Sequence, residues 1–148
     1  MKTLLLICTI LFSSLLSSAQ SSEIALSQLK SVPFTAGDLK ITFTNVKGRM
    51  LVANLSNYLG YRGSIRIEVE NISRVFATFN PEDVSVVDRD DHQADILGLE
   101  INSTNIFPAE TRRIAPKATI KAAYVLTDKF EFPVRIYYAG KVLCTVTE

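Results

Sequence analysis

The stretch Ile65-Arg66-Ile67-Glu68-Val69-Glu70 decides the fold of this 148-residue chain. Its β-branched apolar residues alternate with charged residues, so an extended strand places the apolar side chains on one face and the charged side chains on the other. A helix would distribute the same residues around its axis. The segment therefore predicts an antiparallel strand with one face in the core.

The same period of two continues on both sides of this strand. Upstream, Leu39 to Phe43 alternates, and Gly48 is expected to turn the chain into another strand, Met50 to Leu55. Downstream, extended segments recur about every ten residues: Val75 to Phe79, Val84 to Val87, Ile96 to Ile101, Ile120 to Leu126, Val134 to Tyr138 and Val142 to Thr147. Ala139-Gly140 predicts a tight turn. We predict an immunoglobulin-like antiparallel β-sandwich of seven to nine strands over residues 38–148, because no helical period is long enough for parallel crossovers.

The N-terminal segment Met1 to Ala19 has the features of a signal peptide: Lys2, an apolar run from Leu4 to Phe12, and small residues before Gln20. The apolar run is shorter than the roughly 20 residues of a membrane span. We therefore expect cleavage after Ala19 and an exported chain, periplasmic or secreted, with no transmembrane anchor. Residues 20–37 form a Ser-rich lead-in whose apolar cluster, Ile24 to Leu29, is either a short helical turn or an edge strand.

Charge and cysteine content limit the possible functions of the chain. The formal charge of +1 falls to zero when Lys2 is removed, so no net field attracts nucleic acid. The basic cluster Arg112, Arg113, Lys117 and Lys121 is interpreted as a solvated sheet edge. Removal of Cys8 leaves Cys144 and no intrachain disulfide; alternation with Val142 and Val146 favours a buried core thiol over an intermolecular disulfide or a nucleophile.

The segment Ile65 to Tyr138 resembles a bacterial family of exported, telokin-like immunoglobulin-fold domains of uncharacterised function. The resembling residues are Val69-Glu70-Asn71-Ile72-Ser73, the acidic turn Asp88-Arg89-Asp90-Asp91, Ile114-Ala115-Pro116 and the strand Val134 to Tyr138. The family commonly has Gly at the end of the acidic turn and after the proline, where this chain has Asp91 or His92 and Lys117. The resemblance implies a binding or scaffold module outside the cytoplasm.

The acidic turn is a candidate calcium site. Asp88, Asp90, Asp91 and Asp95 surround His92, and calcium binds six to eight oxygen ligands. The sequence lacks the glycine and glutamate of the calcium-loop pattern, and Arg89 would repel a cation. We therefore favour a turn whose Asp side chains bond their own backbone. One histidine and one buried cysteine do not supply a zinc site, and we expect no metal and no cofactor.

Tyr58, Tyr61 and Arg62 are the candidate ligand-binding residues. They are expected on a glycine-flexed loop, Asn57 to Gly63, where aromatic rings beside a guanidinium can bind a sugar or a peptide. The alternative is that one tyrosine packs on the sandwich and the other lies on the surface.

Enzymatic motifs are incomplete. Ser27-Gln28-Leu29-Lys30 matches a Ser-x-x-Lys pattern without its companion elements, and nothing places His92 against a serine. Asn54, Asn71 and Asn102 begin glycosylation-type triplets, which we interpret as turn and strand-end residues.

Because the enzymatic motifs are incomplete, we expect no enzyme, but a binding or structural module of the bacterial cell envelope with a protein or glycan partner. The alternatives are a carbohydrate-binding or calcium-assisted module and, less favoured, a small secreted hydrolase. The uncharged strand Val142 to Thr147 is the sheet edge at which we expect association with a partner.

Overall fold

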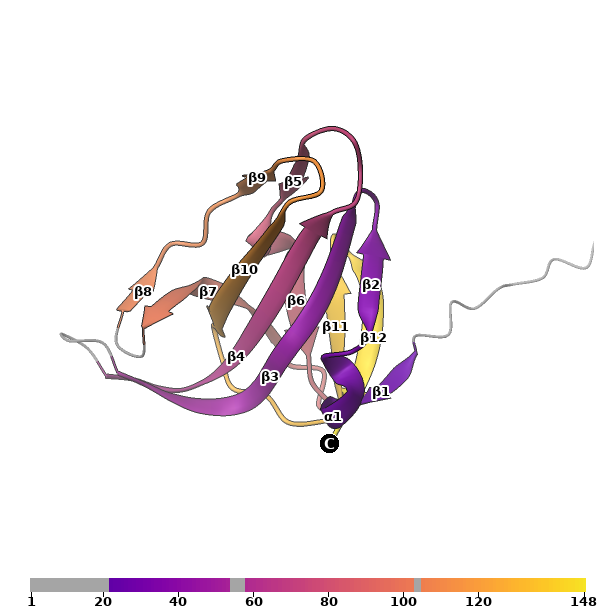
Figure 1. The fold of residues 1–148 in the computed structure, drawn as a ribbon. Helices are drawn as coiled ribbons and strands as arrows, with labels where there is room; N and C mark the ends of the chain where they lie inside the picture. Colours follow the sequence, from indigo (N-terminus) through magenta and orange to yellow (C-terminus); the bar gives the residue numbers. More distant parts are fainter. Residues whose placement is uncertain (1–21, 54–57, 103–104) are drawn as a thin grey trace, which may run out of the picture.

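The computed structural model describes residues 22–53, 58–102 and 105–148, and these form an all-β sandwich with one short α-helix (Figure 1). The predicted signal peptide lies outside the described residues. In chain order the elements are β1 (Glu23–Ala25), α1 (Leu26–Leu29), β2 (Pro33–Ala36), β3 (Leu39–Ala53), β4 (Tyr58–Asn71), β5 (Ala77–Phe79), the 3-10 helix η1 (Pro81–Asp83), β6 (Val84–Val87), β7 (Gln93–Asn102), β8 (Asn105–Phe107), β9 (Arg112–Ile114), β10 (Thr119–Leu126), β11 (Val134–Tyr138) and β12 (Lys141–Thr147).

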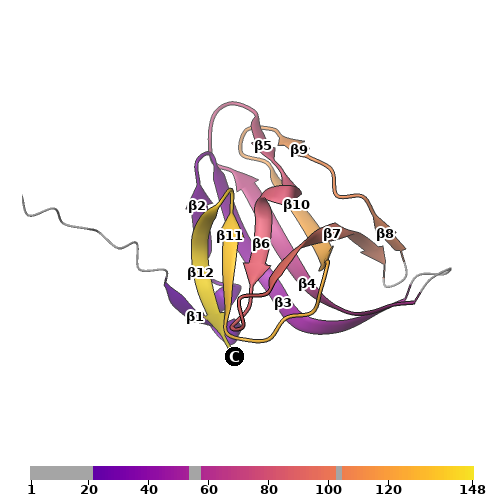
Figure 2. The same ribbon diagram turned by 180° about the vertical axis from the view of Figure 1, so that it is seen from behind.

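One continuous hydrogen-bonded sheet contains most of these strands, in the order β1-β12-β11-β6-β7-β10-β4-β3-β2. β8 pairs with β7, and β5 and β9 form a separate pair. β7 pairs with β6 at Gln93–Asp95 and with β10 from Ile96 to Leu99, so it passes from one layer of the sandwich to the other. Figure 2 shows the layer of β6, β11 and β12 from its outer side, with β2, β3 and β4 behind it. β1 is the exception to antiparallel pairing, because it runs parallel to β12.

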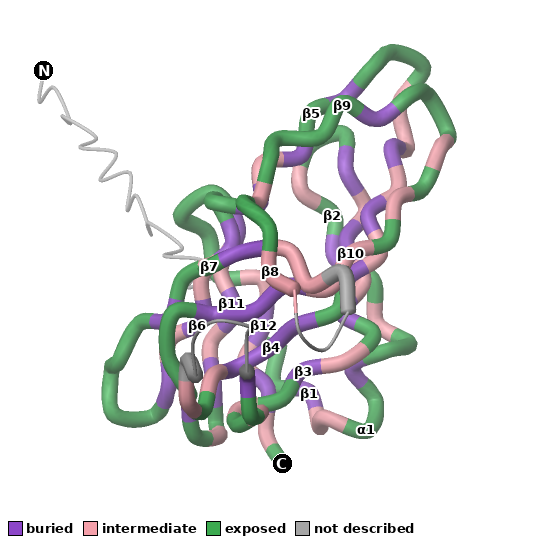
Figure 3. Tube along the Cα trace, turned by 90° about the vertical axis from the view of Figure 1, so that its left-hand side faces the viewer, coloured by how far each residue is buried: buried purple, intermediate pink, exposed green. Residues whose placement is uncertain are grey.

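The core lies between the two layers and follows the predicted alternation. Ile65, Ile67 and Val69 are at most 1% exposed, and Ile136 and Cys144 face them from the other layer with no exposed surface. Figure 3 shows buried residues along strands of both layers and exposed residues at most turns. Full burial of each aliphatic side chain is worth about 1.5–3 kcal/mol. The prediction of an all-β sandwich is confirmed, and Cys144 is buried in the core, as the alternation predicted.

The predicted turn at Gly48 is wrong, because β3 runs unbroken from Leu39 to Ala53 and pairs with β4 along most of its length. Gly48 has a different role: the Phe130 N–H donates to its carbonyl at 2.9 Å, and a Cβ at Gly48 would lie 2.3 Å from the Phe130 carbonyl oxygen. The glycine therefore permits the chain between β10 and β11 to cross the β3–β4 hairpin closely.

The described residues contain more strands than the seven to nine expected. Several of the additional strands are only three or four residues long, too short to show a period of two. Two of them, β1 and β2, come from the Ser-rich lead-in, where the structure shows both alternatives: residues 23–25 pair at a sheet edge, and Leu26–Leu29 form a single helical turn. This lead-in crosses from the layer of β12 to the layer of β3 and closes the lower part of the open side of the sandwich (Figure 1).

Candidate functional site

The acidic turn is organised by Asp88, which is 5% exposed. Its Oδ1 accepts hydrogen bonds from the N–H groups of Asp90 and His92, both at 2.9 Å. Burial acts to raise the pKa of Asp88, but these backbone hydrogen bonds and the nearby His92 outweigh it and hold the pKa below its usual value. The side chain thus bonds its own turn, as the favoured interpretation of this segment requires.

The other candidate calcium ligands do not converge on one point. Asp88, Asp90 and His92 place ligand atoms within 4.8 Å of one another. Asp91 instead pairs with Arg135, and Asp95 accepts a hydrogen bond from Gln93 at 2.7 Å. Two carboxylates and one imidazole provide less than the six to eight oxygens that calcium binds. The geometry therefore explains this turn as a structural element.

The expectation of a loop carrying Tyr58, Tyr61 and Arg62 is wrong, because all three residues belong to β4. Pairing with β3 continues to Tyr58, opposite Ala53, so the hairpin is longer than the glycines suggested. Tyr61 is 45% exposed, and its ring carries the Arg49 guanidinium at 3.9 Å. Arg62 instead donates to the Thr127 carbonyl. Adjacent strand residues point to opposite faces, so Tyr61 and Arg62 do not form one binding platform.

The basic cluster is divided among different partners. The Lys121 Nζ lies 2.7 Å from the Glu68 carboxylate, Lys117 donates to the Ile72 carbonyl, and Arg113 lies 4.3 Å from the centre of the Phe76 ring. Three of the four cations are thus engaged locally. This arrangement provides no continuous basic surface for a phosphate backbone.

The residues considered for hydrolysis also lie apart from any catalytic arrangement. Ser27 and Lys30 are exposed at the single helical turn, and the His92 side chain is 78% exposed beside Asp88. A general base needs a nucleophile within hydrogen-bond reach. Among the described residues, no hydrogen bond joins His92 to a serine.

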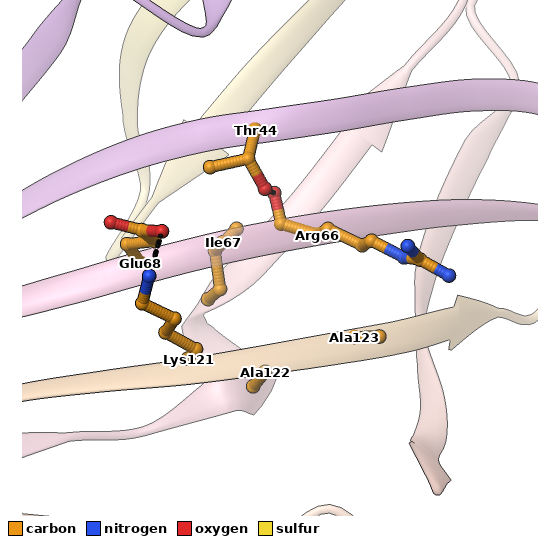
Figure 4. Close-up of a pocket in the computed structure, with 7 residues that line it drawn as sticks. All are labelled: Thr44, Arg66, Ile67, Glu68, Lys121, Ala122 and Ala123. Atoms are coloured by element: carbon orange, nitrogen blue, oxygen red, sulfur yellow. Dashed lines mark hydrogen bonds and ion pairs between the residues drawn. The ribbon is translucent and has the colours of Figure 1, made fainter. Parts of the chain in front are cut away.

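A shallow depression of about 280 Å³ lies on the outer face of β3, β4 and β10. Figure 4 shows the Glu68–Lys121 ion pair at one end and the Arg66 side chain extending toward the other, past Ala123. Thr44 donates to the Arg66 carbonyl at 3.3 Å. Ala123 has a small side chain, so a hollow remains beside it. The charged residues Arg66, Glu68 and Lys121 line this hollow, which is open to solvent.

A larger hollow of about 400 Å³ opens between the ends of β2 and β12. Figures 1 and 2 show these strands side by side at the open margin of the sandwich. Most of its lining is apolar or small: Thr35, Ala36, Gly37, Tyr138, Ala139, Lys141, Val142 and Leu143. We call this hollow, with these eight lining residues, the β2–β12 cleft.

Backbone edges flank the β2–β12 cleft on both sides. β2 pairs with β3 along one edge, and no described strand pairs with its other edge. β12 was expected to be open throughout, and this is wrong for its second half: β1 pairs with Thr145–Thr147, and the Thr145 N–H donates to the Ser22 carbonyl at 3.1 Å. No described strand covers Lys141–Leu143 on the side away from β11. The open edge of β12 is therefore shorter than predicted. The unpaired edge of β2 flanks the other side of the cleft.

The contribution of β2 to this cleft was not predicted from the sequence. Pro33 gives no clear signal, because it is the first residue of β2 and proline is tolerated at the first residue of any strand. Within the described part of the chain, no helix is long and apolar enough to cross a membrane.

No protein-family model matches the sequence, and comparison with curated proteins gives no match. Solved structures do resemble the fold. The yjhA protein of Bacillus subtilis has a TM-score of 0.50 and 16% identity, covering 80% of this chain and 81% of its own. An uncharacterised β-sandwich protein of Clostridium difficile has a TM-score of 0.51 and 11% identity, covering 86% and 95%. MPT63, a secreted protein of Mycobacterium tuberculosis, has a TM-score of 0.53 and 15% identity, covering 88% and 100%. At these identities the likeness shows a β-sandwich fold shared with bacterial proteins, one of them secreted.

Proposed function

We propose that the protein is an exported, non-enzymatic binding module that receives an extended peptide segment of a partner protein in the β2–β12 cleft. The observation that carries this proposal is the pair of strand edges flanking a largely apolar hollow of about 400 Å³. Strand addition uses backbone hydrogen bonds for affinity and side-chain pockets for specificity.

The chain already contains an example of such pairing. β1 is three residues long and docks parallel to β12 at Thr145–Thr147. The edge of β12 therefore accepts a short strand from the N-terminal lead-in. A partner segment placed beside Lys141–Leu143 would continue the same ladder toward the turn at Ala139-Gly140.

The lining of the cleft defines the chemistry of the partner. At about 30 Å³ per water-sized group, 400 Å³ holds roughly thirteen groups, which corresponds to the side chains of two or three apolar residues. Lys141 is the charged residue of the lining, and it is exposed. The partner we propose is an extended apolar segment with an acidic side chain or a carboxyl terminus near Lys141.

Location outside the cytoplasm is part of the proposal. It is supported by the signal-peptide features of Met1 to Ala19, by the resemblance of Ile65 to Tyr138 to exported telokin-like domains, and by the secreted state of one structural neighbour. A cell-envelope role as a binding or structural module follows from that location.

The test is selection of peptides from a random displayed library with the mature domain Gln20 to Glu148. Val142→Lys should abolish binding of the selected peptides, because it adds a charge to the apolar lining. Val75→Lys is the control, since Val75 is also an exposed valine and is not among the lining residues. Hydrogen exchange at residues 141–143 should slow when peptide binds.

Three results would reject the proposal: no enriched peptide, equal binding by Val142→Lys, or protection confined to another surface. A concentration-dependent dimer that Val142→Lys abolishes would instead assign the cleft to a second copy of the chain.

A further inference from the structure

A second hollow, of about 250 Å³, lies on the inner face of β10 and has no role in the proposed peptide binding. It is lined by Leu99, Arg112, Ile120, Lys121, Ala122 and Tyr124. We call it the Tyr124 pocket. It involves β7, β9 and β10, whereas the β2–β12 cleft involves β2, β11 and β12.

An apolar row leads out of the Tyr124 pocket across neighbouring strands. Tyr124 of β10 lies opposite Leu99 of β7, and Leu99 lies opposite Phe107 of β8. Directly opposed residues of antiparallel strands share a face, so the three side chains form one row. Tyr124 is 2% exposed, whereas Phe107 is 50% exposed. The row therefore runs from the core to solvent and provides an apolar wall for a ligand.

Tyr124 contributes a phenol hydroxyl to the lining of the pocket, although the residue as a whole is 2% exposed. A phenol O–H can donate a hydrogen bond to an acceptor atom of a ligand.

Arg112 supplies the positive charge. Its side chain is exposed and forms no ion pair with any residue that the structure describes. Arg112 and Tyr124 both line the hollow. Burial raises the pKa of Tyr124, and the nearby charge of Arg112 opposes that rise. The adjacent Arg113 stacks on Phe76 instead. An arginine fork and a phenol O–H together match the two oxygens of a carboxylate.

We propose that the Tyr124 pocket binds a small monocarboxylate with an apolar body. The carboxylate pairs with Arg112 and accepts a hydrogen bond from the Tyr124 hydroxyl, and the body packs on Leu99 and Ile120 toward Phe107. At about 30 Å³ per water-sized group, the hollow holds roughly eight groups, which matches a benzoate-sized or hexanoate-sized acid.

The experiment is titration of the isotope-labelled mature domain with benzoate, followed through its backbone amide NMR signals. Benzyl alcohol is the neutral ligand of similar shape. We expect benzoate to shift the amides of Leu99, Ile120 and Tyr124, and benzyl alcohol to bind at least tenfold more weakly. Arg112→Gln should weaken benzoate binding about tenfold, and Tyr124→Phe about three- to tenfold. Arg113→Gln, its matched neighbour, should change binding less than twofold.

Equal binding of benzoate and benzyl alcohol would overturn the proposal, as would undiminished binding in Arg112→Gln or shifts confined to amides outside the pocket. Circular dichroism establishes that each variant is folded. If Tyr124→Phe fails to fold, the exposed Arg112 decides the outcome, because its replacement removes no core packing.

Discussion

The side-chain amide of Asn71 donates a hydrogen bond at 3.0 Å to the carbonyl of Ile114, 43 residues further along the chain. The same Nδ2 donates to Val75 at 2.7 Å, and Oδ1 accepts from the N–H and hydroxyl of Ser73 at 2.9 and 2.8 Å. Asn71 has no exposed surface. Its glycosylation-type triplet is therefore a structural junction between the end of β4 and β9, as the interpretation of a strand-end residue predicts.

Asn71→Asp should destabilise the fold by about 3 kcal/mol, because it replaces two N–H donors by acceptors facing the carbonyls of Val75 and Ile114. Urea unfolding of the mature domain measures the loss. Asn45→Asp is the control, since Asn45 is only partly buried, and it should change the free energy of unfolding by less than 1 kcal/mol. Equal effects of both substitutions would contradict the assigned role of Asn71.

Gly63 lies beneath Phe130, and a Cβ there would be 2.5 Å from the ring atom Cε1. Gly63→Ala should therefore cost about 1–3 kcal/mol through overpacking. Combining it with Phe130→Leu, which shortens the opposing side chain, should give a loss at least about 1 kcal/mol smaller than the sum of the single losses. Strict additivity in urea unfolding would show that the ring and the glycine do not restrict each other.

The sequence predicted the features that depend on neighbouring residues. Alternation along Ile65 to Glu70 assigned the core face correctly, and the clustered acidic residues predicted the bonds that Asp88 makes within its own turn. Cys144 was placed in the core by the same alternation. Each of these depends on a period of two or on a side chain bonding within four residues.

Features built from distant segments could not be predicted in this way. The parallel pair of Glu23 with Thr145 joins the two ends of the described chain, and nothing local in either segment indicates it. The residues between Gly60 and Gly63 suggested a loop, yet pairing with β3 outweighs their turn tendency. Alternation places Tyr124 on an inner face but does not show that Arg112 lies near it.

Ala139 adopts φ 48° immediately before Gly140 at φ 74°, so the β11–β12 turn has positive φ at both central positions. Asn is favoured over Ala at the first of these positions. Ala139→Asn should therefore raise the free energy of unfolding by about 0.5–1 kcal/mol, and Ala139→Val should lower it by about 1–2 kcal/mol. Thermal unfolding of both variants checks the sign; equal stability of the two would contradict the turn conformation.

Asp88 should stabilise the fold only while it is ionised. Its folded pKa is lowered from 3.8, so the contribution is present above the unfolded value and disappears as pH falls through the folded pKa. Asp88→Asn should thus be less stable than the native chain at pH 7, and the difference should shrink as pH falls below the unfolded value of 3.8. Urea titrations across this pH range measure the difference in stability.

Millimolar calcium should leave the Tm of the native chain unchanged. A rise in Tm that Asp88→Asn abolishes would instead show a calcium site.

Burial raises the pKa of the Cys144 thiol to about 12, well above the ordinary value of 9.0. The folded protein therefore keeps the thiol neutral where the unfolded chain ionises it, so stability is full below pH 9 and falls as pH rises toward 12. Cys144→Ala should cost about 1–2 kcal/mol at pH 7, and this difference should decrease above pH 9. Tyr124 and Tyr138, whose pKa values are also raised, add a loss of stability of the same sign at high pH in the native chain and in Cys144→Ala.

In the same pH series, a thiol reagent should label Cys144 only as the chain unfolds. Rapid labelling of the folded protein at pH 8 would contradict the place of Cys144 in the core.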